Sequence, residues 1–148
     1  MCGINGIFHL NSKPVDKNQL VKMRDILEHR GPDDSGIFLE NNIGLGHRRL
    51  SIIDTSSAGH QPFYSENGRY ILVYNGEIYN YQSFYDELKS KGIILKTGSD
   101  TEVLLKLYEL YGLEILPRLN GMFAFAIWDK EEKKLVLVRD RKIGRAHV

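Results

Sequence analysis

The chain has 148 residues, of which 42% are hydrophobic and 26% are charged, and its formal net charge is +1. This composition is typical of a single globular domain, and the near-neutral charge gives no attraction to nucleic acid or to an anionic membrane. No apolar run approaches the roughly 18 residues that a membrane span needs. The single cysteine excludes an internal disulfide, which favours a reducing compartment, and we expect a cytoplasmic protein.

Hydrophobic periodicity, caps and turn residues predict both strands and helices. In the first half of the chain, we expect a strand at 4–10, a helix from Asp16 that ends before Gly31-Pro32, and strands at 37–39 and 43–53. A loop at 55–63 then leads to a strand at 70–74 that Asn75-Gly76 ends. Helices capped by Asn80 and Ser99 follow, and the chain continues with a hairpin of strands at 122–128 and 135–138. Ser99 and Glu102 have the spacing of a capping box.

The order of these elements predicts the fold class. Strands come first, helices follow, and strands return, whereas a parallel doubly wound sheet needs strands and helices that alternate singly. We therefore expect an α+β protein with two antiparallel sheets and helices outside. No linker or internal repeat divides the chain.

The single cysteine is residue 2, directly after Met1. We expect Met1 to be removed, which would give Cys2 a free α-amine beside its thiol. A terminal amine can act as the base for a nucleophile on its own residue, and a thiol and an α-amine have similar proton affinities in model peptides. The alternative is that a small residue follows Met1 by chance.

Four short segments combine glycine with polar side chains. They are residues 30–33, 46–52, 75–80 and 98–102. Each also has an ordinary structural explanation, such as a plain Asn-Gly turn or a helix cap. A histidine such as His47 or His60 could act as base to Cys2, as in papain-like enzymes. The histidines and the lone cysteine do not have metal-ligand spacing, so no metal site is expected.

Taken together, these segments resemble the class II glutamine amidotransferases, which use an N-terminal nucleophile, and in particular the glutaminase domain of asparagine synthetase. The matching segments are Cys2-Gly3-Ile4, Arg30-Gly31-Pro32-Asp33, Arg49-Leu50-Ser51-Ile52, Gln61-Pro62, 75–80, 98–102, 120–126 and Arg139-Asp140-Arg141. This resemblance covers residues 2–141. It implies a four-layer αββα sandwich of the N-terminal nucleophile hydrolase type.

The resemblance also implies roles for individual residues. Cys2 would attack the side-chain amide of L-glutamine, and Asn75 with Gly76 would stabilise the oxyanion. Arg49 would bind the α-carboxylate, and Asp100, assisted by the segment Asn75-Gly76-Glu77, would bind the α-ammonium. The implied glutamine pocket comprises Arg49, Leu50, Ser51, Ile52, Ile53, Asn75, Gly76, Glu77 and Asp100.

The pattern departs from the family after Arg141, where residues 142–148 read like a translated sequencing adapter. We expect a C-terminally incomplete amidotransferase domain at 2–141 and a non-native tail at 142–148. The parent would carry a synthetase domain that amidates aspartate with ATP and Mg²⁺, while this domain needs no cofactor. The alternatives are a class II amidotransferase that serves a sugar phosphate or phosphoribosyl acceptor, or a non-catalytic interaction fragment. The synthetase domain is the expected partner, and a homodimer stays open.

Overall fold

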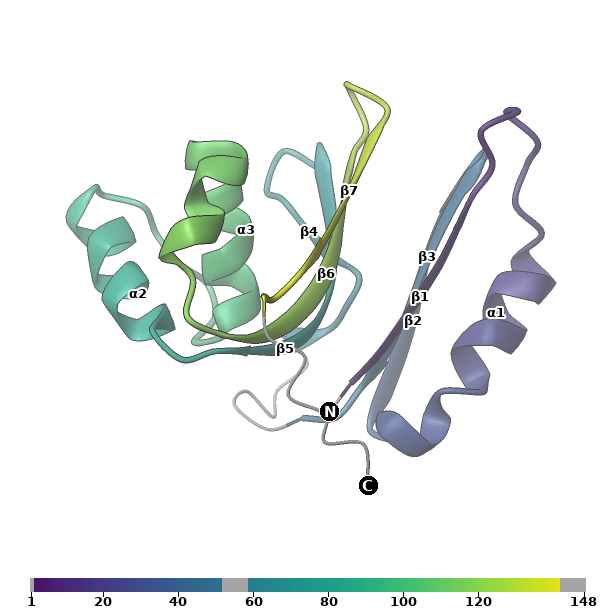
Figure 1. Ribbon diagram of the computed structural model, residues 1–148, viewed down its shortest axis with the longest axis horizontal. Coiled ribbons are helices and arrows are strands. Elements are labelled where there is room, and N and C mark those ends of the chain that lie inside the picture. The colour runs from purple at the N-terminus through teal and green to yellow at the C-terminus, as the bar shows by residue number, and fades with distance from the viewer. Residues whose placement is uncertain (1, 52–58, 142–148) are drawn as a thin grey trace.

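The structure, a computed structural model, describes residues 2–51 and 59–141 (Figure 1). Its elements are β1 (Gly3–Phe8), α1 (Lys17–Asp25), the 3₁₀ helix η1 (Glu28–Arg30), β2 (Asp34–Glu40), β3 (Ile43–Arg49), β4 (Phe63–Tyr64), β5 (Tyr70–Ile78), α2 (Tyr81–Ser90), α3 (Asp100–Tyr111), the 3₁₀ helix η3 (Gly112–Arg118), β6 (Gly121–Asp129) and β7 (Lys134–Arg139). Among these helices, none is long and apolar enough to cross a membrane.

Two antiparallel sheets form the centre of the molecule. One has the strand order β1-β3-β2, and the other has the order β4-β5-β6-β7. In Figure 1 the two sheets face each other, with α1 on the outer side of the first and α2 and α3 on the outer side of the second. This arrangement confirms the predicted α+β sandwich of two sheets with helices outside.

The central strands β5 and β6 are buried on both faces. Successive side chains of a strand point to opposite sides, so each strand contributes to two cores. One cluster lies between the sheets and contains Phe38, Ile43, Leu45, Ile71, Val73, Ala126 and Trp128. A second lies beneath the helices and contains Leu72, Tyr74, Ile78, Leu104, Leu105, Phe123, Phe125, Ile127 and Val136. Tyr74 therefore faces the helical layer near the start of α3.

Two sequence predictions about strand ends were wrong. Asn75-Gly76 does not end β5, because both residues pair within the sheet, Asn75 with Ala124 and Gly76 with Phe123. A Cβ on Gly76 would lie 2.2 Å from the Met122 carbonyl oxygen, so this glycine permits a close approach of two strands. The expected loop at 55–63 also runs into a short strand, β4, at its end. In both places, pairing with another strand determined the structure, although the local sequence favoured a turn or loop.

The capping predictions held in part. The Asp16 side chain caps α1 by accepting from Asn18 N–H. Asn80 precedes α2 but makes no side-chain cap; instead its Oδ1 accepts from Asn120 N–H at 3.0 Å and its Nδ2 donates to the Arg118 carbonyl at 3.0 Å. Asn80 therefore ties the start of α2 to the segment that enters β6.

Candidate active site

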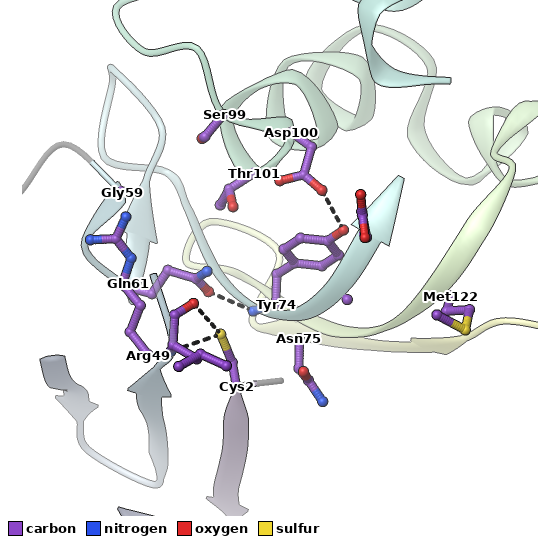
Figure 2. Close-up of a pocket in the computed structure, with 13 residues that line it drawn as sticks. Cys2, Arg49, Gly59, Gln61, Tyr74, Asn75, Ser99, Asp100, Thr101 and Met122 are labelled. Carbon is purple, nitrogen blue, oxygen red and sulfur yellow. Dashed lines mark hydrogen bonds between the residues drawn. The ribbon is translucent and has the colours of Figure 1, made fainter. Parts of the chain in front are cut away.

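A cavity of about 110 Å³ opens where β1, β3, β5 and α3 come together (Figure 2). Its lining consists of Cys2, Arg49, Leu50, Gly59, Gln61, Tyr74, Asn75, Gly76, Glu77, Ser99, Asp100, Thr101 and Met122. Seven of these residues were predicted from the sequence as site residues. Ser51 is described but does not line the cavity, and Ile52 and Ile53 lie outside the described residues.

Cys2 is fixed at the start of β1 by contacts with two other segments. The Leu50 N–H donates to the Cys2 sulfur at 3.3 Å, and the sulfur lies 3.6 Å from the Leu50 carbonyl oxygen. The Arg30 Nε donates to the Cys2 carbonyl at 3.2 Å. A backbone N–H directed at sulfur interacts favourably with negative charge there. The thiol is therefore held at the cavity wall beside a suitable donor.

The segment 30–33, to which the sequence interpretation gave no catalytic step, connects Cys2 with Arg49. A Cβ on Gly31 would lie 2.4 Å from the Arg48 carbonyl carbon, so the segment packs directly on the peptide that leads into Arg49. The Asp33 N–H donates to the Arg49 carbonyl at 3.0 Å, and the Asp33 carboxylate accepts from Ser51 N–H at 2.8 Å. These contacts fix the backbone on both sides of Leu50.

Arg49 is the last residue of β3, and only 7% of it is exposed. A Cβ on Gly59 would lie 2.1 Å from its Nη2, so the absence of a side chain there leaves room for the guanidinium. A guanidinium can bind both oxygens of a carboxylate in parallel. Arg49 thus brings a positive charge to one side of the cavity.

Asp100 brings a negative charge to another side. It is the first residue of α3 and is 4% exposed, and its Oδ2 accepts from the Tyr74 hydroxyl at 2.7 Å and from Ile78 N–H at 3.1 Å (Figure 2). Burial raises the pKa of Asp100, although these two hydrogen bonds act in the opposite direction. Its place in the first turn of a helix also favours the ionised form.

The helix that carries Asp100 begins as predicted at Ser99, whose hydroxyl accepts from Glu102 N–H at 3.4 Å. The reciprocal hydrogen bond of a capping box, from the Ser99 N–H to the Glu102 carboxylate, is absent from the described hydrogen bonds. The Glu102 carboxylate instead accepts from the N–H groups of Lys96, at 2.9 Å and 3.0 Å, and of Thr97, at 2.6 Å. Glu102 therefore orders the loop before α3 rather than its first residue.

Asn75 provides an amide with unused hydrogen-bonding capacity. Its Oδ1 is buried and has no partner among the residues that the structure describes. Buried polar atoms are usually hydrogen-bonded, and exceptions are commonly found at functional sites. Asn75 and Gly76 both line the cavity, as Cys2 does. The unpartnered Oδ1 can only accept a hydrogen bond, so an oxyanion there would need the Asn75 Nδ2 and the Gly76 N–H as donors.

Six lining residues had no predicted role in the site, and two of them, Gln61 and Tyr74, are joined by a hydrogen bond. The Gln61 side chain is buried, and its Oε1 accepts from Tyr74 N–H at 2.7 Å. Gln61 stood in one of the matching segments, so a buried polar role could have been suspected. Tyr74 gave no such signal, because an aromatic residue in an apolar strand reads as core.

The histidines near the site make other contacts. The His47 Nε2 donates to the Tyr74 carbonyl at 3.0 Å, and burial lowers the pKa of His47 to about 4. The His60 Nδ1 lies 2.7 Å from the Asp34 carboxylate. These contacts do not support a histidine base for Cys2. Within residues 2–51 and 59–141, no group of three or more His, Cys, Asp or Glu residues could hold a metal ion.

Comparisons with known proteins show which family this chain resembles. Residues 1–145 match the family model of the glutamine amidotransferase domain. The chain is 46% identical over 143 residues to asparagine synthetase [glutamine-hydrolyzing] 1 of Bacillus subtilis, covering 95% of this chain and 22% of the relative. It is 42% identical over 141 residues to asparagine synthetase B [glutamine-hydrolyzing] of Escherichia coli, covering 95% and 25%. The chain thus spans about a quarter of the length of these relatives.

A solved structure shares the fold. Glutamine phosphoribosylpyrophosphate amidotransferase from B. subtilis, complexed with ADP and GMP, superposes with a TM-score of 0.75 at 24% identity, over 93% of this chain and 37% of that one. At this identity the match concerns the arrangement of sheets and helices. Because the family model covers nearly the whole chain, the protein belongs to the class II glutamine amidotransferase domain family.

Proposed function

We propose that this chain hydrolyses L-glutamine to glutamate and ammonia through a thioester on Cys2. The observation that carries the proposal is the cavity itself, which has the Cys2 thiol, the Asn75 side-chain amide, a cation and an anion in its wall. These four groups match the four features of glutamine: an electrophilic amide carbon, its oxygen, an α-carboxylate and an α-ammonium. Arg49 and Asp100 hold the amino-acid end, so the amide end reaches Cys2.

In the first step, the Cys2 thiol gives its proton to the α-amine of the same residue, the sulfur attacks the amide carbon, and the electrons of the C=O bond move to oxygen. The Asn75 side-chain amide and the Gly76 N–H donate to this oxyanion, and one such donor typically contributes about 10²–10³ in rate. The C–N bond then breaks, and the α-ammonium of Cys2 gives its proton to the departing nitrogen, which leaves as ammonia.

In the second step, water attacks the thioester carbon while the α-amine of Cys2 takes a proton from that water. The C–S bond breaks, and glutamate and the free thiol result. This scheme requires a free α-amine on Cys2 and hence removal of Met1. The backbone contacts from Leu50 and Arg30 support it, because they hold the cysteine where such a terminus would act.

We further propose that the parent protein is an asparagine synthetase in which residues 2–141 form the amidotransferase domain. The ammonia would serve the ATP- and Mg²⁺-dependent amidation of aspartate in a synthetase domain beyond this chain. Identities of 42–46% to two asparagine synthetases support this acceptor over a sugar phosphate or phosphoribosyl acceptor. Sequencing the gene past codon 141 tests both this proposal and the assignment of residues 142–148 as a non-native tail.

The test of the glutaminase proposal uses the chain with and without its nucleophile. Mass spectrometry should show loss of Met1, the chain should release ammonia from glutamine, and a glutamine-like electrophile should label it once. The Cys2→Ala variant should lose both labelling and turnover, because no other thiol exists in the sequence. Glutaminase activity retained in Cys2→Ala, or full activity in protein that keeps Met1, would refute the mechanism.

A further inference from the structure

Tyr74 connects three separate segments around the cavity. Its hydroxyl donates to Asp100 Oδ2 at 2.7 Å and its N–H donates to Gln61 Oε1 at 2.7 Å (Figure 2). Its carbonyl accepts from His47 Nε2 at 3.0 Å. These partners come from α3, from the loop before β4 and from β3 of the opposite sheet. Because hydrogen bonds hold both the N–H and the carbonyl of Tyr74, its side chain has little freedom to move the hydroxyl away from Asp100.

The direction of the Tyr74–Asp100 hydrogen bond is fixed by charge. Burial and the neighbouring Asp100 raise the pKa of Tyr74, so its phenol stays protonated and donates. The other ionisable groups near this pair are Glu77 and Cys2, whose negative forms raise the pKa of Tyr74 further. Glu77 also raises the pKa of Asp100. The phenol is therefore one of the few contacts that favour the charged carboxylate at a buried position.

The Tyr74 hydroxyl and the Ile78 N–H both contact Oδ2 of Asp100, and Asp100 lines the cavity. A backbone hydrogen bond from Thr101 also favours the charged carboxylate. A ligand cation in the cavity would meet a carboxylate whose rotation is restricted by these donors. Pre-organisation of this kind raises affinity for the group that the carboxylate recognises.

We propose that the Tyr74 hydroxyl is a positioning group that holds Asp100 ionised and oriented, and that it thereby makes the pocket select ligands with an α-ammonium. This inference rests on the proposed function, since it takes glutamine as the ligand. It adds a residue that acts on binding selectivity through Asp100. Tyr74 takes no part in the bond-breaking steps.

The experiment compares two ligands that differ only in the α-amino group, L-glutamine and glutaramate. Their dissociation constants are measured by calorimetry in a Cys2→Ala background, where glutamine is not consumed. Tyr74→Phe keeps the ring and removes the hydroxyl. We expect it to lower the preference for glutamine over glutaramate about tenfold, the typical effect of losing a hydrogen bond to a charged group. Glutaramate affinity itself should change little.

Two controls separate this role from a general effect on folding. Tyr70→Phe alters a ring on the same strand that packs edge-on against Tyr108, outside the cavity lining, and should leave the preference unchanged. In an Asp100→Asn background, Tyr74→Phe should cause no further fall, because the two residues act as one unit. Should Tyr74→Phe fail to fold, 3-fluorotyrosine at position 74 keeps the ring with a stronger donor and should maintain or increase the preference.

The outcomes distinguish this inference from the proposed function. If Cys2→Ala binds glutamine but Tyr74→Phe leaves the preference for glutamine over glutaramate unchanged or higher, or 3-fluorotyrosine lowers it, the positioning role is wrong while the glutaminase proposal stands. If the chain with Cys2 binds glutamine and shows the Tyr74 effect but releases no ammonia, the glutaminase proposal fails and the positioning role stands. Absence of glutamine binding in every variant overturns both.

Discussion

His47 should make the free energy of unfolding depend on pH at values well above those at which carboxylates titrate. Its side chain is fully buried in β3, and its Nε2 donates to the Tyr74 carbonyl of the opposite sheet. Its Nδ1 is buried and has no partner within the described part of the chain, so a second proton there would be poorly solvated. Burial accordingly lowers the pKa of His47 from 6.5 to about 4.

The size and sign of the effect follow from proton linkage. As the pH falls below about 6.5, the unfolded chain binds a proton at this histidine and the folded chain does not, so the unfolded state gains stability. The full contribution is present above about pH 6.5 and is lost as the pH falls toward 4. Between about pH 7.5 and about pH 5, the free energy of unfolding should decrease by about 2 kcal/mol from this residue alone.

Other titratable groups change the free energy of unfolding in a different pH range or in the opposite direction. Burial would raise the pKa of Asp129, but its hydrogen bond from Arg69 lowers it overall, so its contribution is present above 3.8 and is lost only below that value. Burial raises the pKa of Asp100, which offsets part of the loss as the pH falls toward 3.8. The interval from about pH 7.5 to about pH 5 therefore isolates His47 best.

The assay is urea unfolding at several pH values, with His47→Gln as the test variant. Glutamine can still donate an N–H from a similar position but does not titrate, so the pH dependence should become flatter by about 2 kcal/mol over this interval. His29→Gln, which alters an exposed histidine, is the matched control and should keep the wild-type slope. An unchanged slope in His47→Gln would show that the buried imidazole is not the source.

Two further substitutions test the scaffold around the site and the hairpin. Gly31→Ala should raise the KM for glutamine about tenfold, because a Cβ 2.4 Å from the Arg48 carbonyl carbon forces the segment beside Arg49 to move. Its control is Gly98→Ala, where a Cβ meets no atom within 4 Å. Equal effects of the two substitutions on KM would contradict this reasoning. Asp129→Asn should lower the free energy of unfolding by about 2 kcal/mol in urea titrations, because Asp129 accepts from Arg69 at 2.7 Å and from two backbone N–H groups of the turn. Glu131→Gln, which removes the charge of one exposed partner of Arg69, should have little effect, and a loss as large as that of Asp129→Asn would argue against the buried contact.

Much of the fold could be predicted because its signals are local. The hydrophobic periodicity of α3 and the cap at Ser99 lie within a few residues of each other, and the alternation of large and small residues in β6 marks a strand buried on both faces. Asn75-Gly76 shows where such reasoning stops. The same dipeptide suits a turn or a close strand pair, and only β6 on the other side of it decides between them.

The sequence by itself predicted the two-sheet architecture, and its resemblance to the class II glutamine amidotransferases indicated Cys2, Arg49, Asn75 and Asp100 as candidate site residues, because residue types and motif spacing are properties of the chain. Only the tertiary structure decided what supports them. Gln61 and Tyr74 contact the site through hydrogen bonds between distant segments, and segment 30–33 packs on the backbone of Arg49. Such contacts leave no periodic or local trace, since they depend on which atoms two packed sheets bring within reach of each other.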